Sequence, residues 1–457
     1  MIQLKHIKLG NFKCFSDELD LELGKLTLLT GANSTGKSSL MYGVLGALQS
    51  PRFPYEFSAN GRYVNMGNFS EMVYGHEKAL PITVGFTLVE NDSPIEVKTL
   101  WINDKSEQAV LKEYEAHSQG FDFNIRRKEG GESSDFLLSM DYRSQAGQNH
   151  DLHGLELLLT DIYRTAELFK IFQKGDNLAD EFLAGYKEQT TVNDILLKVG
   201  ESGAICPDNL KATVAFGLVN RKIVDLIRRY QEKMNFISSY RLPGERIYLE
   251  ESLENGKIHA SGKGFVNQLL KWRENNRKYY ESLIAALRSM GILYDIEPER
   301  IGSGQFKIGV TIHKDGPTAL LTDVGFGISQ LLPVIVGDIE LGDGSTLFAA
   351  QPEIHLHPNA QASYADYLIR QLDNKNNYVV ETHSEYLLNR VRLAIVKGKL
   401  KEEDIRVYYL SQERDSSRIY PIRFTRGGQI IGAPKDFFET YMLDVMDIAM
   451  EAVGDEA

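Results

Sequence analysis

The stretch that decides the expected fold is "GANSTGKS", residues 31–38. It fits the pattern G-x-x-x-x-G-K-[ST], in which the glycines let the backbone curl so that successive N–H groups face phosphate oxygens. In this pattern Lys37 reaches the β- and γ-phosphates, and the Ser38 hydroxyl is offered to Mg²⁺ at the positive end of the next helix. The sequence therefore predicts a site for ATP and Mg²⁺. The residues expected to bind ATP are Gly31, Asn33, Ser34, Thr35, Gly36, Lys37, Ser38 and Ser39.

The sequence on both sides of this loop supports the same interpretation. An apolar run, "KLTLLT", precedes the loop, and "KSSLMYGVLGALQ" follows it with Leu40, Val44 and Leu48 at helical spacing. A chance match to the pattern would not bring a strand and an amphipathic helix with it. We therefore expect a strand–loop–helix unit.

Composition limits the class of protein. A chain of 457 residues with 42% apolar and 25% charged residues suits two or three domains, or one large α/β domain with an insertion. No apolar run reaches the length of a membrane span, and the alternating start "MIQLKHIKLG" predicts a strand, not a signal peptide. With only Cys14 and Cys206, the sequence favours a reducing cytoplasm. A net charge of −12 argues against a protein that coats nucleic acid, but leaves room for a local basic surface.

Strands and helices alternate in the last third of the chain. We predict helices over 327–339, 359–372 and 385–397, interleaved with strands over 345–350, 377–381 and 405–411. This order implies a largely parallel sheet covered by helices. The alternating residues 81–102 predict an antiparallel strand pair, and a long helix is expected over 263–291.

The strand predicted at 345–350 lacks the residue that a phosphate-loop site needs. Such sites hold Mg²⁺ through a carboxylate at the end of a neighbouring strand. Here the apolar run "STLFA" leads instead into Ala350 and Gln351, followed by Pro352 and Glu353.

Four segments together resemble a known family. They are "IKLGNFKCFSDELDLEL" (7–23), "DVGFGISQLLPVIV" (323–336), "LFAAQPEIHLHP" (347–358) and "VVETHSEYLLNRVR" (379–392). In this order they resemble the opening strands, signature, Walker B with D-loop, and switch-histidine segments of compact prokaryotic ABC-type ATPases of the SMC, RecF and OLD-like kind. The resemblance implies an α/β P-loop NTPase head built from residues 1–103 and 234–457. Residues 104–233, with helical patterns at 154–173 and 211–234, are expected to form a mainly helical insertion.

The resemblance also implies roles for further residues. Gly325, Gly327 and Ser329 are expected to lie against the γ-phosphate bound by a partner subunit, so that ATP is sandwiched in a homodimer or a higher oligomer. His383 is expected to hydrogen-bond the γ-phosphate or to position water. The catalytic positions are Ala350, where the family has an acid, Gln351 and His383.

Ala350 predicts that ATP is bound and hydrolysed very slowly, because a methyl group cannot orient water. It is either the natural residue of a pseudo-ATPase or an introduced Glu→Ala replacement at Walker B. The other motifs look intact, which favours the second explanation.

The segment 263–288 has two possible interpretations. It carries six basic residues against Glu274 and Glu281, with aromatic residues between them. It is either a surface for DNA or a partner, or a solvated helix whose aromatic residues pack onto the core. The residues are Lys263, Lys271, Trp272, Arg273, Arg277, Lys278, Tyr279, Tyr280 and Arg288.

The function expected from the resemblance is control of a separate protein. Compact ATPases of this kind sense invasion and act through a separately encoded effector, a nuclease or toxin, in prokaryotic anti-phage defence systems. The alternative is a RecF- or SMC-like repair ATPase that acts on DNA ends or junctions.

Overall fold

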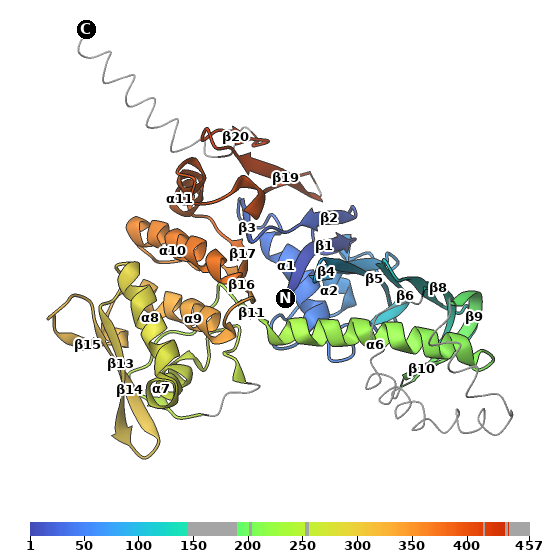
Figure 1. Cartoon of the computed structure of the whole chain (residues 1–457), viewed down its shortest axis with the longest axis horizontal. Helices are drawn as coiled ribbons and strands as arrows, with labels where there is room; N and C mark the ends of the chain where they lie inside the picture. The colour runs from blue at the N-terminus through green and yellow to red at the C-terminus, as the bar shows by residue number, and fades with distance from the viewer. Residues whose placement is uncertain (144–189, 201–202, 252–255, 415, 435–436, 438–457) are drawn as a thin grey trace, which may run out of the picture. The chain divides into compact units, whose positions relative to one another are not determined.

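The computed structural model describes residues 1–143, 190–200, 203–251, 256–414, 416–434 and 437 (Figure 1). The chain divides into two compact units. The first comprises residues 1–21, 42–61 and 65–232, and the second comprises residues 22–41, 62–64 and 233–457. Within the described residues, no helix combines the length and the apolar character needed to cross a membrane.

The first unit is built on a nine-stranded sheet with the order β10-β9-β8-β7-β6-β5-β4-β1-β2. Neighbouring strands from β4 to β10 pair antiparallel, as does β1 with β4. The predicted antiparallel pair at 81–102 is confirmed as β4 and β5. The strands are β1 (Ile2–Gly10), β2 (Leu19–Glu22), β4 (Ile82–Glu90), β5 (Ser93–Asn103), β6 (Ala109–Ser118), β7 (Phe121–Arg127), β8 (Asp135–Tyr142), β9 (Thr190–Gly200) and β10 (Gly203–Ile205).

One long helix, α6 (Leu210–Glu232), runs along this sheet (Figure 1). Its buried residues recur at helical spacing, as at Phe216, Val219 and Ile223. The ring of Phe216 meets that of Phe123 on β7 edge to face, with 5.1 Å between centroids. The unit also contains the short helices α2 (Phe69–Met72) and η1 (Tyr74–His76).

The prediction of a mainly helical insertion at 104–233 is wrong for the described residues. Strands β6 to β10 predominate there, and α6 is the predicted 211–234 helix. The reason is visible in β7, where buried Phe121, Phe123 and Ile125 alternate with less buried residues, a period of two that suits a sheet. No boundary falls at 104 either, because β5 pairs with β6 across it. The helical pattern at 154–173 lies outside the described residues.

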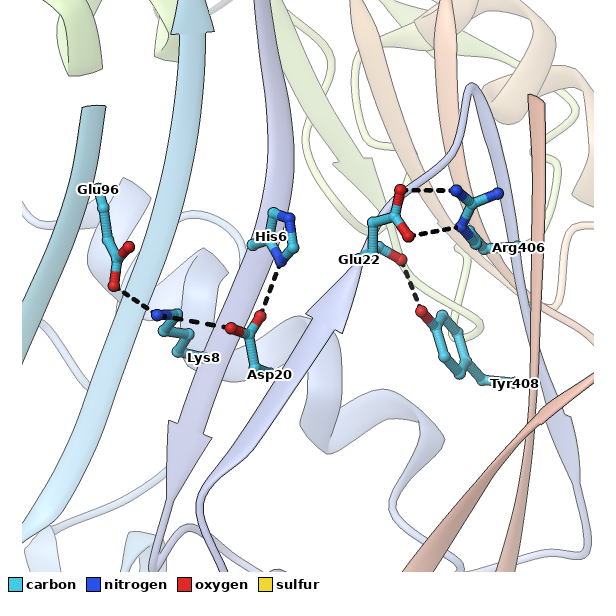
Figure 2. A network of polar contacts seen from close by, with 7 residues as sticks. All are labelled: His6, Lys8, Asp20, Glu22, Glu96, Arg406 and Tyr408. Atoms are coloured by element: carbon cyan, nitrogen blue, oxygen red, sulfur yellow. Dashed lines mark hydrogen bonds and ion pairs between the residues drawn. The ribbon is translucent and has the colours of Figure 1, made fainter. Parts of the chain in front are cut away.

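Charged side chains connect strands at the sheet edge (Figure 2). Lys8 on β1 lies between Asp20 on β2, at 3.5 Å, and Glu96 on β5, and His6 contacts Asp20 at 2.8 Å. In the second unit, the Glu22 carboxylate accepts two hydrogen bonds from Arg406, at 2.6 and 3.0 Å, while the Glu22 carbonyl accepts one from the Tyr408 hydroxyl at 2.7 Å (Figure 2). Partly exposed pairs of this kind each contribute about 0–1 kcal/mol.

The second unit is built on a seven-stranded sheet with the order β11-β16-β17-β3-β18-β19-β20. The first five strands are parallel and the last two pair antiparallel. Strands β16 and β17 are buried along their whole length, as expected of parallel strands covered on both faces. The strands are β3 (Leu26–Gly31), β11 (Met234–Ile237), β16 (Thr346–Ala350), β17 (Asn377–Glu381), β18 (Ile405–Glu413), β19 (Ser416–Phe424) and β20 (Ile430–Ile431).

Helices accompany this sheet, and a smaller sheet of β12 (Tyr248–Leu249), β13 (Asp295–Gly302), β14 (Gln305–Thr311) and β15 (Thr318–Leu320) joins the same core. The predicted α/β class and its alternating order are confirmed. The helix expected over 263–291 is instead two helices, because Asn276 leaves the helical region with φ −145° and ψ 70°. The helices are α7 (Phe265–Asn275), α8 (Arg277–Ser289), η3 (Leu321–Asp323), α9 (Phe326–Leu341), α10 (Pro358–Gln371), η4 (Leu372–Asn374), α11 (Glu385–Val396) and η5 (Glu402–Asp404). Helix α1 (Lys37–Gln49) begins in this unit, and its residues 42–49 belong to the first unit.

Candidate nucleotide-binding site

The candidate site lies in the second unit, at the carboxyl ends of three adjacent parallel strands. Leu29 on β3 is in register with Glu381 on β17, and Glu381 is in register with Ala350 on β16. The segments that follow these strands therefore begin side by side. In open α/β sheets, ligands bind at this edge.

The phosphate loop depends on glycine at its first position. Gly31 has φ +133°, and a Cβ there would stand 2.1 Å from the carbonyl oxygen of Leu410 on β18. Gly36 and Ser34 are also in the positive-φ region, at 87° and 63°. The Thr35 hydroxyl donates to the Ala32 carbonyl at 2.9 Å, which closes the loop on itself. No side chain other than hydrogen fits at position 31.

Lys37 places a cation inside this loop. Its ammonium donates to the carbonyls of Gly31, at 3.2 Å, and Ala32, and the side chain is buried. Burial lowers the pKa of Lys37, and the negative charge of Glu381 opposes that effect. A buried cation at a helix N-terminus suits an anionic ligand such as a phosphate.

A carboxylate stands beside the loop. Glu381 is buried, and its Oε2 accepts a hydrogen bond from the Ser38 hydroxyl at 2.6 Å. Its Oε1 lies 3.4 Å from the amide nitrogen of Gln351, which donates to it. Sequence reasoning assigned Glu381 no role. The sequence did contain a signal for it, because Glu381 ends the strand "NYVVE". A carboxylate at the end of a neighbouring strand, which was expected at residue 350, is also what Glu381 provides.

Gln351 occupies a strained turn after β16. Its φ is +46°, and its backbone N–H donates to the Glu381 carbonyl at 2.8 Å. Its own carbonyl accepts from Nη2 of Arg241 at 2.6 Å. Arg241 is buried, which lowers its pKa to about 10, and its Nε and Nη1 have no partner within the described part of the chain. The sequence left Arg241 without a role.

Glu353 ties the same turn to the switch-histidine segment. Its Oε1 accepts from the Thr382 hydroxyl at 2.6 Å and from the His383 N–H at 3.0 Å. Burial raises the pKa of Glu353. His383 exposes part of its surface to solvent. Partial burial and then the positive charge of Lys37 lower the pKa of His383, so the ring is neutral at pH 7.

Ala350 is buried at the end of β16, in register with Glu381. Its methyl group offers no oxygen, but the described site is not without carboxylates. Glu381 lies in register with Ala350 on the next strand, and Glu353 follows three residues further along the chain. The structure thus brings together Lys37, Ser38, Gln351 and the His383 segment.

Of the expected signature residues, Gly327 lies against the turn after β16. Gly325 precedes α9, and a Cβ on Gly327 would stand 2.4 Å from the carbonyl oxygen of His355. The Ser329 hydroxyl is buried and donates to the Phe326 carbonyl at 2.8 Å. Phe326 is exposed, and its ring meets that of His355 at 5.0 Å. Gly325 is the open position of this segment.

The segment 263–288 does not expose its aromatic side chains as a surface on which bases could stack. Trp272 and Tyr280 are buried in the core, and Tyr279 stacks on Trp272 with centroids 5.4 Å apart. Arg273 bonds Glu297, and Arg277 bonds Glu281 at 3.0 Å. The second of the two interpretations, aromatic residues packed onto the core, describes Trp272 and Tyr280.

Three comparisons with known proteins were made: family models, curated proteins and solved structures. Residues 220–388 match the AAA_15 family model, described as an AAA ATPase domain. The comparison with curated proteins gave no match.

Among solved structures, a Pyrococcus yayanosii Smc head domain with a coiled coil and joint is 12% identical, with TM-score 0.42, covering 94% of this chain and 98% of that one. A Pyrococcus furiosus Smc head domain bound to the C-terminal domain of ScpA is 10% identical, with TM-score 0.40, covering 99% and 100%. The SMC head domain of Thermotoga maritima is 10% identical, with TM-score 0.37, covering 92% and 98%. These likenesses are too low to transfer a function.

The phosphate loop lies outside the matched residues and joins them through the pairing of β3 with β17. The residues similar to the AAA ATPase domain model include Gln351, Glu381 and His383.

Proposed function

We propose that this chain is an ABC-type ATPase head that binds ATP with Mg²⁺ at residues 31–39. The observation that carries the proposal is the buried Lys37 inside a loop that only glycine can start, with Ser38 bonded to Glu381 beside it. Backbone N–H groups of the loop would receive the phosphates, and Lys37 would neutralise them.

The residues fit Mg²⁺ as well as phosphate. The Ser38 hydroxyl is a hard oxygen donor with a carboxylate directly behind it. Bound there, Mg²⁺ would offset negative charge on the phosphate oxygens. The neutral His383 ring and the Gln351 amide would orient the terminal phosphate or a water molecule.

Slow hydrolysis follows from position 350. A methyl group neither accepts a proton nor orients water, and the Gln351 amide is not a base. The head would therefore hold ATP for long periods. This is expected whether Ala350 is natural or an introduced replacement of glutamate.

Assembly on ATP is the second part of the proposal. Gly325 is open and Phe326 is exposed at the start of α9, so that this helix N-terminus is accessible to a phosphate carried by a second copy. A homodimer with ATP between its heads, or a higher oligomer, would result.

Control of a separately encoded effector in a cytoplasmic anti-phage defence system is supported by the family resemblance alone. The aromatic residues of 263–288 no longer favour the alternative of a DNA repair ATPase, because Trp272 and Tyr280 are buried and cannot stack on bases. Co-purification with proteins from the flanking genes tests this part. A chain that recovers no partner, and binds DNA ends in a salt-sensitive manner, would favour repair.

The core of the proposal is tested by ATP titration calorimetry and by native mass measurement with and without ATP. Lys37→Ala should abolish ATP binding, whereas Lys314→Ala, which removes an exposed lysine far along the chain, should not. The mass should at least double with ATP. ATP binding that survives loss of Lys37 would refute the site, and an unchanged mass would refute assembly.

A further inference from the structure

The strongest unexplained feature of the site is the buried carboxylate of Glu381. It ends β17, the strand between β16 and β3, so it lies next to both the phosphate loop and position 350. Both of its oxygens face groups of the site, with Ser38 at 2.6 Å and the Gln351 amide at 3.4 Å. The charge of Lys37 also acts on it.

We propose that Glu381 is the metal-positioning carboxylate of this site: it supplies the carboxylate for Mg²⁺ that position 350 lacks, but not the acid that would activate water. The inference rests on the proposed ATP site. A serine hydroxyl that ligates Mg²⁺ must turn a lone pair toward the metal and its hydrogen away from it. The Ser38 hydroxyl already donates that hydrogen to Glu381, so the free lone pairs are available for the metal.

Two further effects follow from the same arrangement. The negative charge of Glu381, one hydrogen bond behind the ligand, strengthens the attraction of the site for a divalent cation. The Gln351 side-chain amide donates to the carboxylate, and Arg241 donates to the backbone carbonyl of the same glutamine, so that both contacts limit the rotation of Glu381. Glu381 is therefore a positioning residue that acts through Ser38.

The in-register neighbours Ala350 and Glu381 make the inference testable. A carboxylate at position 350 would lie on β16, directly beside Glu381 on β17, because the two residues are in register. A glutamate introduced there should therefore replace the function of Glu381 in metal binding.

The experiment measures ATP affinity by calorimetry in Mg²⁺ and in EDTA, and counts bound Mn²⁺ by electron paramagnetic resonance with ATP present. Mg²⁺ should raise the ATP affinity of the unaltered chain, and Glu381→Gln should reduce this gain by about 10–100-fold. The variant should lose Mn²⁺ affinity by the same factor, because loss of a hydrogen-bond partner of a metal ligand usually has an effect of this size. Its affinity for ATP in EDTA should hardly change. The control Glu385→Gln, four residues further on in α11, should leave all three values unchanged.

The double variant Glu381→Gln, Ala350→Glu should regain most of the lost Mg²⁺ dependence. A merely structural role for Glu381 would lower ATP affinity equally in Mg²⁺ and EDTA, and Ala350→Glu would not rescue it. That result would overturn the inference and leave the ATP site intact. If the unaltered chain binds ATP in neither condition, the proposed function itself fails.

Discussion

Arg241 and Gln351 are joined by a hydrogen bond of 2.6 Å, from Nη2 of the arginine to the backbone carbonyl of the glutamine, across 110 positions of sequence. Gln351 has a positive φ, and its side-chain amide faces Glu381. A buried arginine thus fixes the backbone of the turn that carries one expected catalytic position. Glu353, with its own unpaired oxygen within the described structure, lies close enough for the two charges to interact.

Arg241→Met should destabilise the second unit by about 1–3 kcal/mol, because it removes a charged hydrogen-bond donor from a buried carbonyl and a nearby cation from buried Glu353. Urea denaturation measures this loss. The matched control is Arg246→Met, which breaks an exposed pair with Asp323 at 2.7 Å and should cost at most about 1 kcal/mol. Equal losses in the two variants would contradict a structural role for Arg241.

Ala350→Glu should increase ATP-dependent phosphate release by about 100-fold or more, because it restores a group that can orient and activate water. Ala350→Gln adds nearly the same volume without the charge and should leave the rate where it is. A phosphate-release assay with both variants decides. If neither variant changes the rate, the missing acid is not what limits hydrolysis.

Gly325→Leu should leave the fold and ATP binding intact and prevent the increase in native mass that ATP causes. A Cβ at Gly325 meets no described atom within 4 Å, so the new side chain projects into the space proposed for a second copy. Gly327→Ala provides the contrast. Its Cβ would stand 2.4 Å from the His355 carbonyl, so this variant should lower thermal stability. Gly325→Leu heads that still double in mass would refute the proposed interface.

Asp338 should make stability depend on pH in the acid range. It is buried among apolar residues of the second unit, where Tyr378 donates to its oxygens at 2.9 and 3.0 Å and Tyr367 donates as well. Burial raises its pKa from 3.8 to about 6. A carboxyl that holds its proton more tightly when folded adds stability below about pH 4, and that stability is lost as the pH rises to about 6.

The size of this effect is about 3 kcal/mol, at about 1.4 kcal/mol for each pH unit between the two pKa values. Asp338→Asn mimics the protonated form, so its stability relative to the unaltered chain should rise between pH 4 and pH 7 and then level off. Denaturation at a series of pH values measures the difference. A difference that is constant with pH would show that Asp338 does not titrate in this range.

Much of the fold can be predicted from local patterns. Residues 31–38 specify a strand–loop–helix unit because few backbones other than a phosphate loop need those glycines, and α9, α10 and α11 follow from their apolar periodicity. The same reasoning failed at 104–233, where period-two alternation in β7 was missed, and at Asn276, where two helices were merged into one.

The sequence by itself determined the phosphate loop, the α/β order and the absence of an acid at position 350. Only the tertiary structure decided what stands beside that alanine. Strand order places β17 between β16 and β3, so that Glu381, 343 positions from Ser38, bonds its hydroxyl. It likewise brings Arg241 to Gln351. The physical reason is that parallel pairing aligns strand ends from distant parts of the chain, and no local pattern states which strands are neighbours.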